Sequence, residues 1–199
     1  MKLRSRISAG VVTALLAGAG ALATPAATAS ATPTTHQVFA TQARKAGLTD
    51  TQSTELQRQV DATLAESGGR QTAANIVDLG NGTSIRLVVP GEKRVRDLAT
   101  TRGPATGPAL QQYVCPYGDF CAYTEPGYNG KEQRFGACKN QPLLGSGWGG
   151  PGSWYTNQTR LWMLASMYGK TGNWVFTDNG PGDHDLNGNW KPVWSITPC

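Results

Sequence analysis

The positions of the four cysteines constrain the fold of this 199-residue chain more than any other feature. All four lie between Cys115 and Cys199, and all six tryptophans and all six tyrosines lie between residues 113 and 199. Large aromatic side chains bury the most surface per residue. We therefore expect the main hydrophobic core in a C-terminal domain of residues 113–199.

The N-terminus predicts the redox environment of these cysteines. The first six residues carry three cations and no acid, an apolar run spans residues 7–23, and small residues follow it. This pattern is typical of a cleaved signal peptide over residues 1–29, with cleavage after Ala29 or Ala31. The run is shorter than the roughly 20 strongly apolar residues of a membrane anchor. We expect a secreted, extracellular protein that is not attached to a membrane once the signal is removed.

Four cysteines in an exported domain of this size are most simply two disulfides, for which three connectivities exist. Cys115 and Cys121 bracket a Pro/Gly turn, which lets two nearby strand ends face each other within bonding distance. Pairing them leaves Cys138 for Cys199, the last residue. Structural zinc sites favour closely paired Cys or His ligands, and this spacing is absent, so we expect disulfides and no metal.

Charge and histidine content bear on function. The chain has a net charge of +5, but acidic and basic residues balance within 113–199. Nucleic-acid binding needs a clustered cationic face, so we expect none. The only two histidines are His36 and His184, and bridged cysteines leave no Cys–His or Ser–His–Asp arrangement. We predict a monomer that is not an enzyme.

Residues 32–100 predict a small α+β segment of helix and hairpin. Leu56, Val60 and Leu64 recur at four-residue spacing, as on one face of a helix, and a weaker helical stretch covers 38–46. Thr49 and Gln52 have the spacing of a helix capping box.

Two strand-like stretches, 74–79 and 83–89, flank Gly80-Asn81-Gly82, whose residues suit a tight hairpin turn. The basic stretch 93–102 and a Gly/Pro-rich linker over 101–112 look exposed and open to trypsin-like cleavage. Two interpretations of the segment stay open: a pro-segment that is removed, or a permanent accessory domain.

A Greek-key signature follows Cys121 directly. Tyr123, Tyr128 and Gly130 have the βγ-crystallin spacing, in which two aromatic residues stack across a folded hairpin and a glycine adopts a conformation closed to other residues. Together with the preceding Cys-Pro-x-Gly-x-x-Cys, the segment resembles the Streptomyces metalloproteinase inhibitor family, small secreted actinobacterial proteins with one βγ-crystallin-like domain. The likeness is good over 115–136 and looser over 161–176.

The resemblance implies an all-β C-terminal domain, a βγ-crystallin-like double Greek-key sandwich with two disulfides. It also implies peptidase inhibition. The chain departs from the family at Pro181, which stands where the second Greek key should have an aromatic residue. The family's reactive peptide lies beside a second short disulfide loop, whereas here the second bridge is expected to join Cys138 to the C-terminus. No reactive-site residue is therefore carried over.

The Gly-rich loop 139–152 is the candidate inhibitory loop. Its Leu143, Leu144 and Trp148 could offer apolar side chains to a peptidase pocket, and a loop held at its ends loses little entropy on binding. The alternative is a plain connection between the two Greek keys, with both leucines packed inward.

One segment is a weak candidate for calcium. Asp183, Asp185 and Asn187 resemble the opening of an EF-hand loop, but position 12 of that loop is Trp194, which cannot supply the bidentate acid. The alternative is a polar loop with Asx turns. We otherwise expect no cofactor.

The leading prediction is a secreted peptidase inhibitor that occupies the cleft of an extracellular protease, most simply a metallopeptidase. The alternative is a βγ-crystallin-like killer toxin or a cell-wall or glycan-binding module that stacks exposed aromatic rings on sugars. An exposed row of Trp148, Trp174 and Trp190 would favour glycan binding, whereas buried tryptophans beside a protruding loop would favour inhibition.

Overall fold

Two helices open the part of the chain that this computed structural model describes, which is residues 34–99, 115–158 and 164–199. The predicted signal peptide 1–29 and the predicted linker 101–112 lie outside it. Helix α1 spans Thr35–Lys45 and α2 spans Asp50–Ser67. Each begins with a capping box, in which an N-cap threonine and a glutamine three residues later satisfy each other's backbone N–H groups. The box of α2 is the one predicted from Thr49 and Gln52.

A three-stranded unit follows α2. It consists of β1 (Arg70–Ala73), β2 (Ile76–Gly80) and β3 (Thr83–Arg86). Asn81 in the β2–β3 turn has a φ of 52°, between two glycines that also have positive φ. This is the hairpin that the Asn-Gly pair predicts, because few residue types tolerate that backbone conformation.

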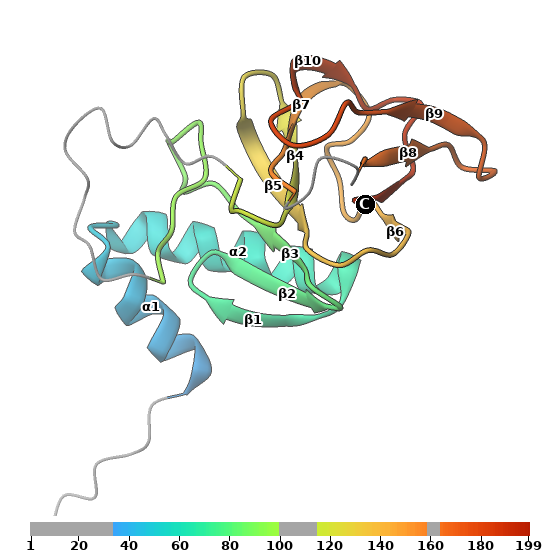
Figure 1. The fold of residues 1–199 in the computed structure, drawn as a ribbon. Helices are drawn as coiled ribbons and strands as arrows, with labels where there is room; N and C mark the ends of the chain where they lie inside the picture. The colour runs from blue at the N-terminus through green and yellow to red at the C-terminus, as the bar shows by residue number, and fades with distance from the viewer. Residues whose placement is uncertain (1–33, 100–114, 159–163) are drawn as a thin grey trace, which may run out of the picture. The chain divides into compact units, whose positions relative to one another are not determined.

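The hairpin continues into the sheet of the C-terminal part. The seven-stranded sheet has the order β1-β2-β3-β5-β4-β7-β10 (Figure 1). Strand β3 pairs antiparallel with β5, with Ile85 opposite Gln133 and Arg86 opposite Glu132. The remaining strands of this sheet are β4 (Phe120–Glu125), β5 (Asn129–Phe135), β7 (Pro151–Thr156) and β10 (His184–Asn189).

A second sheet of four strands has the order β6-β11-β8-β9. Its strands are β6 (Gln141–Pro142), β8 (Ser166–Tyr168), β9 (Trp174–Thr177) and β11 (Ser195–Thr197). Strands β4–β7 form one group of four and strands β8–β11 form another. The third strand of each group lies in the sheet of the other group, because β6 pairs with β11 and β10 pairs with β7. This exchange is the double Greek-key arrangement predicted from the sequence, so the all-β fold class is confirmed.

Two main cores hold these layers together. The first, built on α2 and the hairpin, contains Leu56, Val60 and Ile85, and Leu144 from the distant loop packs against it. The second contains most of the buried aromatic side chains of the described residues, namely Phe120, Phe135, Trp148, Trp154 and Trp190. The aromatic core lies in the C-terminal domain, as composition predicts.

Both predicted disulfides are present. Cys115 bonds to Cys121 and Cys138 bonds to Cys199, with Cα–Cα distances of 5.6 and 5.2 Å. The second bond ties the last residue to the segment between β5 and β6. Among the helices that the structure describes, none combines the length and hydropathy needed to cross a bilayer.

Candidate functional site

The Greek-key corner is packed inward. The ring centroids of Tyr123 and Tyr128 are 5.3 Å apart, and Tyr123 is 1% exposed. Gly130 has a φ of 76°, and a Cβ atom there would collide with Thr124 Oγ1. Burial raises the pKa of Tyr123, with the charge of Glu132 adding to the shift. Tyr123 and Gly130 therefore shape the fold from within the corner, whereas Tyr128 remains partly exposed.

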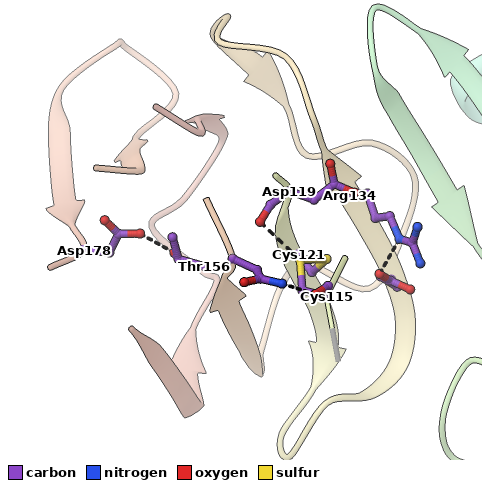
Figure 2. Close-up of a disulfide and its surroundings, with 8 residues drawn as sticks. Cys115, Asp119, Cys121, Arg134, Thr156 and Asp178 are labelled. Carbon is purple, nitrogen blue, oxygen red and sulfur yellow. Dashed lines mark hydrogen bonds and ion pairs between the residues drawn. A yellow bond between two sulfur atoms is a disulfide. The ribbon is translucent and has the colours of Figure 1, made fainter. Parts of the chain in front are cut away.

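The loop between Cys115 and Cys121 is tied at several points. Asn157 Nδ2 donates to the Cys115 carbonyl at 2.7 Å, and the Gly118 N–H donates to the Asn157 carbonyl at 2.7 Å. Both cysteines are buried, and Asp119 lies beside the disulfide (Figure 2). Burial raises the pKa of Asp119, while the charge of Arg86 opposes the rise. The sequence predicts a structural turn between these cysteines and no binding residue in it.

The candidate inhibitory loop 139–152 packs its apolar side chains inward, as in the alternative interpretation. Leu143 is partly buried against the aromatic core, and Leu144 is partly buried against the core of α2 and the hairpin. Trp148 is 9% exposed, and its Nε1 donates to the Leu144 carbonyl at 2.9 Å. The structure thus buries Trp148 and leaves Leu143 and Leu144 only partly exposed, while a role of this loop in peptidase binding stays a prediction.

The tip of that loop is attached to helix α2. The Ser146 N–H donates to Glu66 Oε2 at 3.2 Å, and Lys131 Nζ donates to the Ser146 carbonyl at 2.6 Å. Burial lowers the pKa of Lys131, and the charge of Glu66 opposes this effect. The loop is thus held by groups from both the N-terminal segment and the Greek-key strands.

The tryptophans do not form the exposed row that would favour glycan binding. Trp148 and Trp190 are buried, and Trp190 Nε1 donates to the Tyr123 carbonyl at 2.7 Å. Trp174 is 65% exposed. Trp194, which is not part of the predicted row, is 54% exposed. Among the tryptophans that the structure describes, the indoles of Trp174 and Trp194 therefore reach the surface, both on or beside the second sheet.

The segment considered for calcium uses its acids within the loop. The Asp183 carboxylate accepts from the N–H groups of Asn179 at 2.8 Å and His184 at 2.9 Å. Asp185 Oδ1 accepts from the Asn187 N–H at 2.8 Å. These contacts are typical of a polar loop with Asx turns. Within residues 34–99, 115–158 and 164–199, no group of three or more His, Cys, Asp or Glu side chains is placed to hold a metal ion.

A buried ionic cluster joins β3 to β5, and no sequence pattern predicted it. Glu132 is fully buried, with its Oε1 2.8 Å from Arg134 Nε, and it lies opposite Arg86, which is 5% exposed. Burial raises the pKa of Glu132 to about 8, with the Arg86 charge acting in the opposite direction. Charged groups without water are stable only when paired, so the hairpin and the Greek-key strands depend on each other here.

The family comparison covers the C-terminal part of the chain. Residues 109–175 match the model of peptidase inhibitor family I36. No curated protein and no solved structure matches the chain. Inhibitors bind peptidases and catalyse no reaction of their own, so the match also confirms the prediction that this chain is not an enzyme. Over residues 109–175, the chain is thus similar to peptidase inhibitor family I36, the resemblance that the Greek-key signature and the cysteine motif before it predicted.

Proposed function

We propose that this protein is a secreted inhibitor of an extracellular metallopeptidase and that it acts by occupying the cleft of that enzyme. The observation that carries the proposal is the match of residues 109–175 to a peptidase inhibitor family. The metallopeptidase target follows from the resemblance of the Cys115–Gly136 segment to inhibitors of that class. Two disulfides and the N-terminal signal pattern support a role outside the cell.

A rigid recognition surface supports this mechanism. Both disulfides close onto the Greek-key domain, and the loops around the first are hydrogen-bonded to neighbouring strands. A surface that is already ordered loses little conformational entropy when it binds. The protein would then inhibit by complementary shape, with no covalent step.

We also propose that the N-terminal segment is a permanent part of the inhibitor. Val95 is 2% exposed and packs in a cluster with Cys115, Cys121 and Tyr123, so the basic stretch 93–102 has a buried residue two positions after its exposed first residue, Lys93. Arg94 donates to the Gly127 carbonyl at 3.0 Å. Removing the segment would uncover this cluster and leave the edge of β5 unpaired, a known risk for aggregation.

Sequencing the N-terminus of the secreted protein tests the last point. We expect the mature chain to begin close to Ser30 or Thr32. A start between residues 101 and 112 would show that the segment is removed and would contradict its permanent role.

Inhibition assays test the main proposal. The purified mature protein is titrated against a thermolysin-like metallopeptidase and, in parallel, against trypsin-like and subtilisin-like serine peptidases. We expect stoichiometric inhibition of the metallopeptidase and a one-to-one complex on gel filtration. Activity of every peptidase at saturating protein would overturn the proposal.

Glycan binding is the second candidate. The exposed indoles of Trp174 and Trp194 support it, since Lys170 Nζ lies 5.1 Å from the Trp194 ring and would add a hydrogen-bond donor beside it. Co-sedimentation with insoluble peptidoglycan, compared between the native protein and Trp174→Ala, measures this activity. Equal amounts in the supernatant with and without peptidoglycan would reject this candidate.

A further inference from the structure

One exposed aromatic side chain stands out in the described part of the chain. Tyr117 is 74% exposed, the highest value among the large hydrophobic side chains that the structure describes as exposed. The other tyrosines of the described residues, Tyr123, Tyr128, Tyr155 and Tyr168, are buried or partly buried. Most of the Tyr117 ring therefore lies at the surface and outside the core, where a binding partner can contact it.

Tyr117 also lies in a loop that is constrained by a short disulfide. It lies between Pro116, whose ring fixes φ, and Gly118, which has a φ of 94°. The Cys115–Cys121 disulfide closes the loop at a sequence separation of 6.

Hydrogen bonds fix both sides of the loop to the segment after β7. The Gly118 N–H donates to the Asn157 carbonyl at 2.7 Å, and the Asn157 N–H donates to the Asp119 carbonyl at 2.9 Å. The Asn157 side chain adds its bond to the Cys115 carbonyl. The backbone that carries the tyrosine is therefore ordered before any partner arrives.

These properties match what a cleft-filling inhibitor requires. Binding pockets are concave and mostly apolar, so they admit a protruding segment more readily than a strand face. Tyrosine supplies a large contact area while only two side-chain torsions become fixed, and it is among the residues that dominate binding energy at interfaces. A rigid backbone under it further reduces the entropic cost of binding.

The other exposed or candidate side chains fit this role less well. Leu143, Leu144 and Trp148 are committed to the two cores. Trp174 lies within strand β9, and Trp194 immediately precedes strand β11. Neither tryptophan lies in the short loop that the Cys115–Cys121 disulfide closes.

We infer that Tyr117, presented by the Cys115–Cys121 loop, is the side chain that this protein inserts into an apolar pocket of the peptidase cleft. The inference rests on the proposed inhibitory function and names its principal contact residue. The pocket would accept a flat aromatic ring. The buried Cys115–Cys121 disulfide would hold the loop backbone in its conformation when the ring enters the pocket.

Three variants test the assignment: Tyr117→Ala, Tyr117→Phe and, as a matched exposed aromatic control, Trp174→Ala. For the peptidase that the native protein inhibits, we expect Tyr117→Ala to raise the inhibition constant by at least about 30-fold, as the loss of a binding hot spot does. Tyr117→Phe and Trp174→Ala should inhibit within a few-fold of the native protein. All three should keep the native melting temperature, because both side chains are largely exposed.

A photo-crosslink tests the location directly. With p-benzoylphenylalanine in place of Tyr117, illumination of the complex should join the inhibitor to residues of the peptidase cleft, and a small active-site ligand should suppress the product. Inhibition by Tyr117→Ala equal to that of the native protein, or a crosslink that the active-site ligand leaves unchanged, would overturn the assignment while the inhibitory function stands. Native protein that inhibits no peptidase would instead remove the proposed function, and this inference with it.

Discussion

The long disulfide should contribute more to stability than any other single covalent feature of the chain. Cys138 and Cys199 are separated by 61 positions. The loop-entropy model assigns a bridge of this span about 4 kcal/mol at 25 °C, because it restricts the unfolded chain. Cys138 is exposed and Cys199 is partly buried, so replacing both with alanine removes little packing and isolates the loop-closure effect.

The test compares unfolding in guanidinium chloride. The double variant Cys138→Ala/Cys199→Ala should lose about 4 kcal/mol of unfolding free energy and melt on the order of 10 °C lower. Its m-value should rise, since an uncrosslinked unfolded chain exposes more surface. The matched control is Cys115→Ala/Cys121→Ala, whose loop spans only 6 positions. Its loop-entropy loss is about 2 kcal/mol.

The control also measures packing, because Cys115 and Cys121 are buried. Its total loss can therefore exceed the loop-closure part, whereas the m-value should change less than in the long-loop variant. A loss below about 1 kcal/mol for the long-loop variant, with an unchanged m-value, would refute the loop-entropy reasoning.

Three further predictions concern single side chains. Gly130→Ala should lose about 2 kcal/mol or more of unfolding free energy, since it combines a positive φ with a collision against Thr124; a native melting temperature would contradict this. Leu144→Ala should lose roughly 2 kcal/mol by chemical unfolding, because its side chain fills the core of α2 and the hairpin; an unchanged midpoint would show that the contact adds nothing. The pKa of Glu132 is raised from its usual 4.5 to about 8 in the folded protein. Between these two pH values the folded state keeps a proton on Glu132 that the unfolded state has released. The free energy of unfolding should therefore fall as pH rises from about 5 to 8. Glu132→Gln should flatten this slope, and an equal slope in both proteins would assign it to other groups.

Local signals in the sequence accounted for much of the fold. Thr49 and Gln52 begin α2, and Asn81 turns the hairpin, because these residues satisfy or permit particular backbone conformations within a few positions. Tyr123 and Gly130 shape the Greek-key corner for the same kind of reason. The cysteine pairing followed from a short Pro/Gly turn that leaves one other pair.

The sequence was less informative where burial depends on partners far along the chain. Trp148 and Trp190 are buried, whereas Trp174 and Trp194 are exposed, although all four are the same residue type. Only the pairing of the sheets decides which indole faces the core. The position of a side chain in the assembled sandwich, and not its chemistry, separates the two groups.

The joining of β3 to β5 is the clearest case of a feature decided in tertiary structure. Arg86 and Glu132 are charged residues that would normally indicate a solvent-exposed face, and 45 intervening positions separate them. Nothing in either segment specifies the other as its partner. Residue order thus predicted the turns, caps and bridges that act over short distances. The merging of the N-terminal hairpin with the Greek-key sheet, and the surface that it leaves around Tyr117, depend on contacts that form only when the chain is folded.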